Sequence, residues 1–314
     1  MPRTIDLIGV ASGLGGADHN CAQAPGRLAA AGLDAYLRRS GAHAAWAATL
    51  VPQRLGGGVP RAVARLCARL AAKVAESVRG GRLPCVIGGD HSCAAGTWMG
   101  AARALESQGR GGDFALSKGR LGLVWIDAHM DAHTPGTSPS GRLHGMPLAA
   151  LLGQCDHALE GLEDGVLAAR HICLVGVRSY EPEEARMLAR LGVTVFGMDE
   201  IVRRGLARVL MEAVSLAAEG TAGYGVTLDL DALDPADAPA VATPAPAGIH
   251  GEELVQALEP VGRDPRLVAF EVAEYCPRRD RNRRTERLIL RILSAALGGS
   301  AKDPEIVADA LEAA

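Results

Sequence analysis

The sequence has few aromatic residues, few lysines and no excess of positive charge. Phe, Trp and Tyr together make up 3% of the 314 residues, so a platform for stacking nucleic-acid bases is not expected. The 33 Lys and Arg residues are balanced by 36 Asp and Glu residues, and the formal net charge is −3. Nucleic-acid-binding proteins usually have a strongly basic face, so this balance argues against such a partner. Only three of the 33 cationic residues are lysines, which we attribute to a GC-rich genome and not to a binding function.

The sequence also lacks paired cysteine motifs and long apolar segments. None of the seven cysteines belongs to a Cys-x-x-Cys pair, so a cysteine zinc site has no support. Their odd number and scattered spacing predict reduced, mostly buried thiols. No apolar run reaches the ~18 residues of a membrane span, and the apolar stretch near Met1 is too short for a signal peptide. We therefore expect a soluble cytoplasmic protein with no membrane partner.

The chain alternates between short apolar runs and amphipathic stretches. The runs carry Val, Ile and Leu on both faces, as do strands buried in a parallel sheet. These predicted strands are Ile5–Val10, Leu83–Ile87, Leu121–Ile126, His171–Val177, Val193–Phe196, Gly223–Leu230 and Leu267–Val272. The amphipathic stretches predict helices at Arg61–Val78, Glu183–Leu191, Gly205–Ala218, Gly251–Leu258 and Thr285–Leu297. Such alternation predicts an α/β fold, a three-layer α/β/α arrangement with a mainly parallel central sheet.

We predict a single domain over residues 1–314. Glycine- and proline-rich segments occur at Gly56–Pro60, Thr134–Gly141 and Pro235–Gly248. None has the composition of a long disordered linker, so we interpret them as loops of one domain. Residues Gly298–Ala314 are expected to form a C-terminal tail, a loop followed by a short helix.

Two of the predicted strands end in clusters of polar residues that contain histidine. The first cluster is Gly88-Gly89-Asp90-His91, which alone fits an ordinary turn with a satisfied histidine as well as it fits a functional site. The second follows Leu121–Ile126 and places Asp127, His129 and Asp131 at alternate positions. In an extended chain this spacing points all three side chains to one side. A solvated acidic turn is the alternative explanation.

A third cluster follows the predicted strand Gly223–Leu230. Asp229 and Asp231 are two positions apart with Leu230 between them, so they share a face of an extended chain. A helix cap or a turn would account for Asp234-Pro235, but it does not account for this pair.

The three clusters together predict a metal site. Ligands of α/β proteins bind beyond the carboxyl ends of the strands, and converging carboxylates are costly to bury without a compensating cation. Imidazole and carboxylate without thiolate favour Mn²⁺, Fe²⁺ or Zn²⁺. Two histidines and four aspartates are too many for one open catalytic metal, but they suit two metals about 3.5–4 Å apart that share carboxylates. Such a pair makes hydroxide at neutral pH, so the residues predict a binuclear metal hydrolase.

In order and spacing, the clusters resemble those of the ureohydrolase family, which includes arginases, agmatinases and formimidoylglutamases. The motifs G-G-D-H, D-A-H-x-D and D-x-D-x-x-D-P stand at Gly88–His91, Asp127–Asp131 and Asp229–Pro235. The resemblance covers most of the chain. It implies an arginase-like fold, two Mn²⁺ ions per subunit, a small guanidino substrate and a homo-oligomer, either a trimer or a hexamer.

The resemblance also implies the roles of individual residues. One Mn²⁺ would bind His91, Asp127, Asp131 and Asp229, and the other would bind Asp127, His129, Asp229 and Asp231, so that Asp127 and Asp229 bridge the ions. The bridging hydroxide would attack the guanidinium carbon, and the tetrahedral intermediate would collapse to urea and an amine. Glu274 would orient the guanidinium by charge-assisted hydrogen bonds, and the catalytic group would be Asp131, His144 and Glu274.

Within the family, the loop after the second cluster is most similar to that of arginases. It ends in Ser140-Gly141-Arg142-Leu143-His144-Gly145. By resemblance, Ser140 helps to bind the amino-acid head group, and His144 carries a proton to the leaving amine. A histidine suits that task because its ordinary pKa lies near neutrality, although a surface-loop histidine is the alternative. Thr243 matches a family threonine near the site.

Three positions depart from the arginase pattern. His133 stands where arginases have an Asn that contacts the substrate carboxylate, and Glu181 stands where they have an Asp for the substrate amino group. Ala247-Gly248 replaces the usual double glycine. We count His133, Ser140, Glu181, Thr243 and Glu274 as candidate substrate-binding residues.

The sequence therefore predicts an arginase-type amidinohydrolase that converts L-arginine and water into L-ornithine and urea. One alternative is an amidinohydrolase for another guanidino substrate, such as agmatine or a guanidino acid, or a formimidoylglutamase. Another is a non-catalytic homologue that keeps the fold. A phosphohydrolase is disfavoured because the motif loops contain no Arg or Lys cluster for phosphate.

Overall fold

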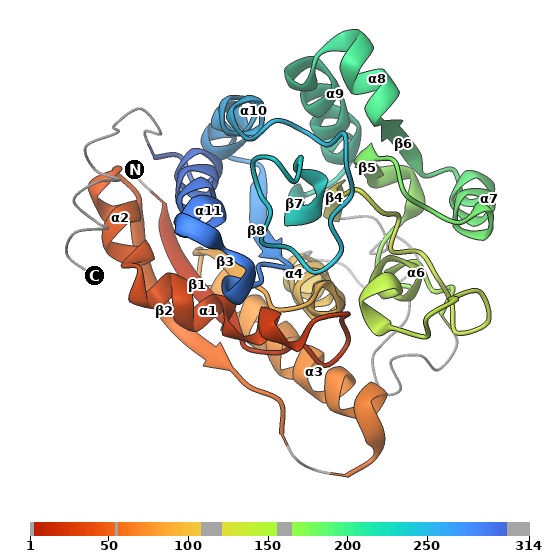
Figure 1. Cartoon of the computed structure of the whole chain (residues 1–314), viewed down its shortest axis with the longest axis horizontal. Coiled ribbons are helices and arrows are strands. Elements are labelled where there is room, and N and C mark those ends of the chain that lie inside the picture. Colours follow the sequence, from red (N-terminus) through yellow and green to blue (C-terminus); the bar gives the residue numbers. More distant parts are fainter. Residues whose placement is uncertain (1–2, 54–55, 108–120, 156–164, 300–314) are drawn as a thin grey trace.

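A single eight-stranded sheet organises the chain, in the strand order β2-β1-β3-β8-β7-β4-β5-β6 (Figure 1). The computed structural model describes residues 3–53, 56–107, 121–155 and 165–299. Every pair of neighbouring strands is parallel. The strands are β1 Thr4–Val10, β2 His43–Leu50, β3 Leu83–Ile87, β4 Leu121–Ile126, β5 Ile172–Val177, β6 Thr194–Gly197, β7 Gly223–Asp229 and β8 Leu267–Ala273. The predicted α/β class and parallel sheet are confirmed.

All seven predicted strands are present; two have the predicted boundaries, and the other five differ by one residue at one or both ends. The sequence did not predict β2, which lies at the edge of the sheet beside β1. Four of its eight residues, His43-Ala-Ala-Trp-Ala-Ala-Thr-Leu50, are alanines, which have little preference for strands. Alternate side chains of β2 are exposed, so the strand also lacks the continuous apolar pattern of the central strands.

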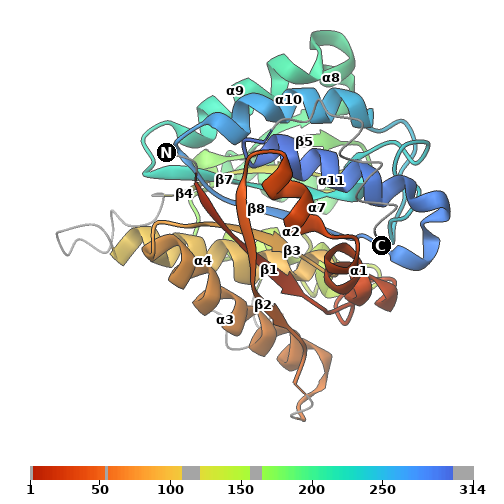
Figure 2. The ribbon, with the colours of Figure 1, turned by 90° about the vertical axis from the view of Figure 1, so that its left-hand side faces the viewer.

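Helices cover both faces of the sheet and form the two outer layers (Figure 2). They are α1 Ala24–Ala30, α2 Leu33–Arg39, α3 Gly58–Arg79, α4 Ala94–Ser107, α6 Pro147–Leu151, α7 Pro182–Leu191, α8 Met198–Arg204, α9 Leu206–Ala218, α10 Gly251–Arg263 and α11 Arg284–Ala296. Strand β4 shows the layering: Val124 and Ile126 pack into the core with α9, α10 and α11, whereas Leu123 and Trp125 pack with α3 and α4. The three-layer prediction is therefore confirmed.

Two helix boundaries differ from the prediction for reasons of proline chemistry. Helix α3 begins at Gly58, inside the segment Gly56–Pro60 that the sequence predicted as a loop. Pro60 lies in the first turn, where a missing backbone N–H costs nothing because it has no intrahelical partner. Helix α10 continues through Pro260 to Arg263, although the sequence predicted an end at Leu258. Burial of Val261 on this last turn outweighs the hydrogen bond that the proline removes.

Close contact between α3 and α4 explains why the sequence missed α4. A Cβ atom at Gly96 would lie 2.6 Å from the carbonyl oxygen of Cys67, and one at Gly100 would lie 2.4 Å from that of Ala71. Glycines are poor helix formers, but here they let two helix backbones approach. Because α4 is buried almost all round, it also lacks the polar face by which the other helices were predicted.

The fold brings the predicted site motifs to one edge of the sheet. The carboxyl ends of β3, β8, β7 and β4 are neighbours. His91 comes after β3, Glu274 follows β8, Asp229 is the last residue of β7 with Asp231 just beyond it, and Asp127 follows β4. Within the described part of the chain, none of the helices combines the length and the apolar character that crossing a membrane requires. Residues 300–314, which make up most of the predicted tail, lie outside the described residues.

Candidate metal centre and active site

The turn after β4 brings together the candidate metal ligands of the second motif, but not by the geometry that the sequence predicted. The strand ends at Ile126, and the chain bends at Ala128 and His129 instead of staying extended. Asp131 has a positive φ of 49°, a left-handed conformation that is uncommon for aspartate. The alternate spacing therefore does not put Asp127, His129 and Asp131 on one face of a strand. A bend and one strained residue bring them together instead.

Four side chains form a first cluster around the imidazole of His91. Its Nδ1 lies 2.8 Å from Oδ2 of Asp131, 3.2 Å from Oδ2 of Asp229 and 3.3 Å from Oδ2 of Asp127. Three carboxylates thus face one nitrogen, which can bond at most one of them well. His91 Nδ1 and Asp131 Oδ2 are buried, and neither is in hydrogen-bonding geometry with any partner in the described residues. A cation between these atoms would satisfy both.

The orientation of His91 is set by groups behind it. Its Nε2 lies 3.0 Å from Oγ1 of Thr227, and its ring packs on Trp125 with centroids 4.6 Å apart. The indole N–H of Trp125 in turn donates to Oδ2 of Asp127 over 2.9 Å. In metal-binding histidines, a hydrogen bond to one ring nitrogen fixes the orientation of the ring and determines that the other nitrogen faces the metal.

A second cluster shares Asp127 with the first. Nδ1 of His129 lies 3.1 Å from Oδ2 of Asp231 and 3.6 Å from Oδ1 of Asp127. The hydroxyl of Thr243 donates to the same Asp231 oxygen over 2.9 Å. Three groups of side chains could each hold a metal, and two of them belong to these clusters: His91, Asp127, Asp131 and Asp229, and Asp127, His129 and Asp231. The third group is His133, Glu181 and Glu184, in which the histidine already pairs with both carboxylates. Asp127 belongs to both of the first two groups, whereas Asp229 belongs to the first only, so its predicted bridging role remains a prediction.

The electrostatics show that this cluster needs positive charge. Burial raises the pKa of Asp229 well above its ordinary range, and the charges of Asp231 and Asp127 raise it further. Burial opposes protonation of His129, but its hydrogen bonds to Asp127 and Asp231 prevail and raise its pKa to about 12. Protonated imidazoles thus provide the charge that divalent cations would provide. The donor set of imidazole and carboxylate without thiolate fits two such cations of the manganese, iron or zinc type.

His144 and Glu274 form an ion pair beside the first cluster. Nδ1 of His144 lies 3.0 Å from Oε1 of Glu274, and the same oxygen accepts the backbone N–H of His91 over 2.8 Å. Burial opposes protonation of His144, but the bond to Glu274 outweighs it and raises the histidine pKa to about 9. His144 lines the site cavity, whereas Glu274 is fully buried behind it and does not. The predicted contact between Glu274 and a substrate guanidinium therefore remains a prediction.

Four of the six cluster residues, His129, Asp131, Asp229 and Asp231, line a cavity of about 250 Å³, and the fully buried His91 and Asp127 lie behind them. We call this end of the cavity the inner end. The outer wall of the cavity contains three residues that the sequence predicted, His133, Ser140 and Glu181. It also contains two that the sequence did not predict, Arg142 and Glu184. The spacing from Glu181 to Glu184 at the start of α7 is typical of a capping box and could have signalled that Glu184 folds back towards Glu181. No local pattern distinguishes Arg142 from other exposed arginines.

The glycines of the first motif serve close packing and not a sharp turn. Gly88 and Gly89 do not adopt positive φ angles. A Cβ atom at Gly89 would lie only 1.7 Å from the carbonyl oxygen of Ser12, so only glycine fits. The adjacent Asp90 is buried and accepts backbone N–H groups of Gly15 and Ser92, each over 3.1 Å. Asp90 therefore fixes the loop that presents His91, a role that the motif did not reveal.

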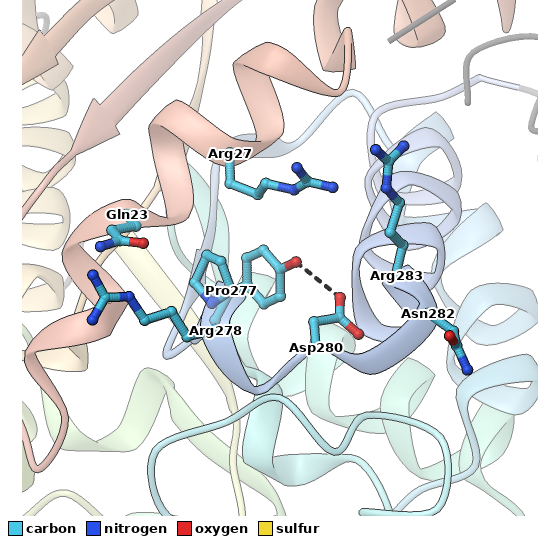
Figure 3. Close-up of a pocket in the computed structure, with 8 residues that line it drawn as sticks. Gln23, Arg27, Pro277, Arg278, Asp280, Asn282 and Arg283 are labelled. Atoms are coloured by element: carbon cyan, nitrogen blue, oxygen red, sulfur yellow. Dashed lines mark hydrogen bonds between the residues drawn. The ribbon is translucent and has the colours of Figure 1, made fainter. Parts of the chain in front are cut away.

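A larger cavity of about 450 Å³ has different chemistry (Figure 3). Three arginines line it, with Arg27 projecting from α1 and Arg283 from the segment before α11. Arg27 pairs with the buried carboxylate of Glu286, and the hydroxyl of Tyr275 donates to Asp280 over 2.8 Å. No group of metal-type ligands lies on this wall within the described residues. The smaller cavity is therefore the candidate active site.

Comparisons with known proteins agree with this geometry. A model of the arginase family matches residues 3–298. The arginase of Bacillus caldovelox is 38% identical over 240 residues, which are 76% of this chain and 76% of that protein. The arginase of Agrobacterium fabrum is 34% identical over 316 residues, covering 94% of this chain and 91% of its own. The native structure of the Bacillus caldovelox arginase matches with a TM-score of 0.84 at 33% identity, over 95% of this chain and 99% of that one.

Proposed function

Because the chain belongs to the arginase family and is an arginase-type amidinohydrolase, we propose that it hydrolyses L-arginine to L-ornithine and urea with two Mn²⁺ ions per subunit. The observation that carries this proposal is the pair of imidazole–carboxylate clusters that share Asp127 at the inner end of one cavity. We assign His91, Asp127, Asp131 and Asp229 to one ion. We assign Asp127, His129, Asp229 and Asp231 to the other.

The metals and the chain have separate tasks in this proposal. When bound, the two ions act as Lewis acids and lower the pKa of a water molecule so that a nucleophile exists at neutral pH. The chain holds the guanidinium of the substrate at the acidic inner end of the cavity. The cation is attracted there because the carboxylates of Asp229, Asp231 and Asp127 lie within a few ångströms of one another in a site shielded from water.

His144 supplies the proton that the leaving amine requires. A guanidinium nitrogen is a poor leaving group until it is protonated, so an acid must stand beside it. Glu274 holds Nδ1 of His144 and raises the histidine pKa to about 9, so the imidazole carries a proton at neutral pH. No partner of its Nε2 occurs among the described residues, so that atom is available for proton transfer. Glu274 acts by orienting His144 and, as proposed from the family, by holding the guanidinium.

The direct test is urea release by the Mn²⁺-loaded protein from a panel of guanidino compounds. We expect release from L-arginine, equimolar L-ornithine, and two metal ions per chain by elemental analysis. A protein that binds two ions and releases no urea from any member of the panel would contradict the proposed reaction. Loading with Zn²⁺ or Fe²⁺ in parallel decides whether manganese is the most active metal.

The family resemblance supports three further parts of the proposal. We propose that residues 1–314 form one domain, that the protein is a homo-oligomer (trimer or hexamer), and that it acts in the cytoplasm. Sedimentation velocity of the metal-loaded protein measures the subunit number directly. A monomer at micromolar concentration would contradict the oligomer.

A further inference from the structure

The outer end of the cavity has hydrogen-bonding groups that are not yet paired within the described part of the chain, and these groups determine what it can bind. Its wall is formed by His133, Ser138, Ser140, Arg142, Glu181 and Glu184. A substrate whose guanidinium lies at the metal clusters must place its other end against these residues. An α-amino acid carries two charges at that end, an ammonium that needs acceptors and a carboxylate that needs donors.

Three of the four carboxylate oxygens of Glu181 and Glu184 already have partners within the chain. Nε2 of His133 lies 2.9 Å from Oε2 of Glu181 and 3.2 Å from Oε2 of Glu184, so the imidazole stands between the two carboxylates. Glu184 also accepts the backbone N–H groups of Ala132 over 3.0 Å and of Glu181 over 3.1 Å. The position between the two carboxylates is where an ammonium would bind best, and His133 fills it.

The imidazole is held in that position from its other side. Nδ1 of His133 lies 3.2 Å from Oγ1 of Thr137, and His133 is 8% exposed. Displacing the ring would break its hydrogen bonds to Thr137 and Glu181 and its contact with Glu184, which costs free energy. An incoming ammonium would therefore meet Glu181 only at its exposed rim, where a charge contact is weak.

The donors of the wall are free. The side chain of Arg142 is exposed and has no interaction within the described residues. The hydroxyl oxygens of Ser138 and Ser140 accept backbone N–H groups of Gly141 and Arg142 over 3.0 and 3.3 Å, so their own O–H groups remain available. A guanidinium and two hydroxyls match the acceptor oxygens of a carboxylate.

We propose that this site selects its substrate by the carboxylate and not by the α-ammonium, so that ω-guanidino carboxylic acids without an α-amino group are substrates beside L-arginine. The inference rests on the proposed hydrolysis. The reaction is unchanged: water adds to the guanidinium carbon, the bond from that carbon to the alkyl nitrogen breaks, and a proton passes to the nitrogen. The products are urea and the corresponding ω-amino acid. Arg142 binds the carboxylate, and His133 determines specificity by filling the ammonium position.

The first test compares three substrates that differ only at the outer end: L-arginine, its desamino analogue 5-guanidinopentanoate, and agmatine, which lacks the carboxylate. We expect kcat/KM for 5-guanidinopentanoate within about tenfold of that for L-arginine, and kcat/KM for agmatine at least about 100-fold lower. A preference of 100-fold or more for L-arginine over the desamino analogue, or equal use of agmatine, overturns the inference.

The second test substitutes two wall residues, His133 and Arg142, one at a time. His133→Asn should free Glu181 and Glu184 and raise the preference for L-arginine over 5-guanidinopentanoate at least about tenfold. Because both substrates meet the same enzyme preparation, any loss of folded protein cancels in this ratio. Arg142→Gln should raise KM for both acids about tenfold and leave kcat nearly constant, since a uniform binding contact is lost.

Arg186→Gln is the matched control, because Arg186 is 71% exposed on α7 and pairs only with Glu183 among the described residues. This variant should leave all three substrates unchanged. An unchanged ratio in His133→Asn, or an unchanged KM in Arg142→Gln, contradicts the assigned roles.

A binding measurement separates this inference from the proposed hydrolysis. Calorimetric titration of the metal-loaded protein with L-ornithine and with 5-aminopentanoate compares the same two outer ends without turnover. Similar affinities support the inference even if no substrate in the panel releases urea, an outcome that would sink only the proposed reaction. A 100-fold weaker binding of 5-aminopentanoate overturns the inference whether or not the protein is active.

Discussion

The inner and outer ends of the active-site cavity are built from different parts of the fold. At the inner end, His91, Asp127 and Asp229 lie at or directly after the ends of central strands and are fully or almost fully buried. At the outer end, Ser140, Arg142 and Glu181 come from a loop and a helix start, and all three are exposed. A sheet edge holds charged groups against one another rigidly, whereas loops can exchange side chains at little cost. The difference places the chemistry on the sheet and the selection of substrate on the loops.

The largest effect is expected at the inner end, from Asp127→Ala. Asp127 belongs to both clusters, so its loss should disrupt both metal positions and lower urea release by at least ~10³-fold. Elemental analysis and urea release on the same sample measure the two consequences. The matched control is Asp199→Ala, an exposed aspartate on α8, which should bind two ions and keep its activity. Retention of activity by Asp127→Ala would contradict the shared-ligand arrangement.

A smaller effect is expected from His144→Asn, between the two ends. Losing the proton donor should lower kcat by about 10²-fold with little change in KM.

The same variant tests the charge on His144. Its pKa is about 9 in the folded chain and about 6.5 when unfolded, so the pair with Glu274 contributes its full stability below pH ~6.5. That contribution is lost as the pH rises through 9, and the variant should lack this decline in thermal unfolding midpoint. A variant whose midpoint falls as steeply as that of the wild type would show that another group is responsible.

Thr243→Val tests the support behind the metal clusters. The hydroxyl of Thr243 donates to Asp231, and removing such a hydrogen bond typically weakens metal binding by about tenfold. We expect this loss at one of the two ions, with nearly normal kcat once metal is in excess. Activity measured as a function of metal concentration separates the affinity for each ion from kcat at saturating metal. Equal weakening of both ions would mean that Thr243 supports the whole site and not the His129 cluster alone.

The smallest effect is expected at Ala247, in the loop that follows the third motif. Its φ is +58°, and its side chain is exposed, so an alanine here is strained without making compensating contacts. Ala247→Gly should raise the free energy of unfolding by about 0.5 kcal/mol, because the relief of strain exceeds the greater freedom of the unfolded chain. Thermal unfolding measures the gain. A loss of stability would mean that the surrounding loop holds the left-handed conformation at no cost.

The sequence predicts the inner end well because each ligand motif directly follows a strongly apolar strand. Strand ends in a parallel sheet meet at one edge, so locating the strands sufficed to bring His91, Asp127 and Asp229 together. The detailed reason was wrong for Asp131, whose position depends on a left-handed residue that no local pattern reveals.

The outer end could not be predicted to the same depth. The contact between His133 and Glu184 joins residues 51 positions apart and depends on where α7 packs, which is a tertiary property. The same limit explains β2 and the continuation of α10 past Pro260, since in both cases packing overrides local preference.

The strand order has a consequence for the assembly of the protein during synthesis. Strands β2, β1 and β3 form one flank of the sheet, β4, β5 and β6 form the other, and the last two strands, β7 and β8, lie between them. A nascent chain that ends before Gly223 therefore has two half-sheets, with His91 on one and Asp127 on the other. Contacts of such long sequence separation form slowly, and they cannot form before the final strands leave the ribosome. The metal site thus cannot form before β8 is in place, and a bound metal ion reports that the two half-sheets have joined.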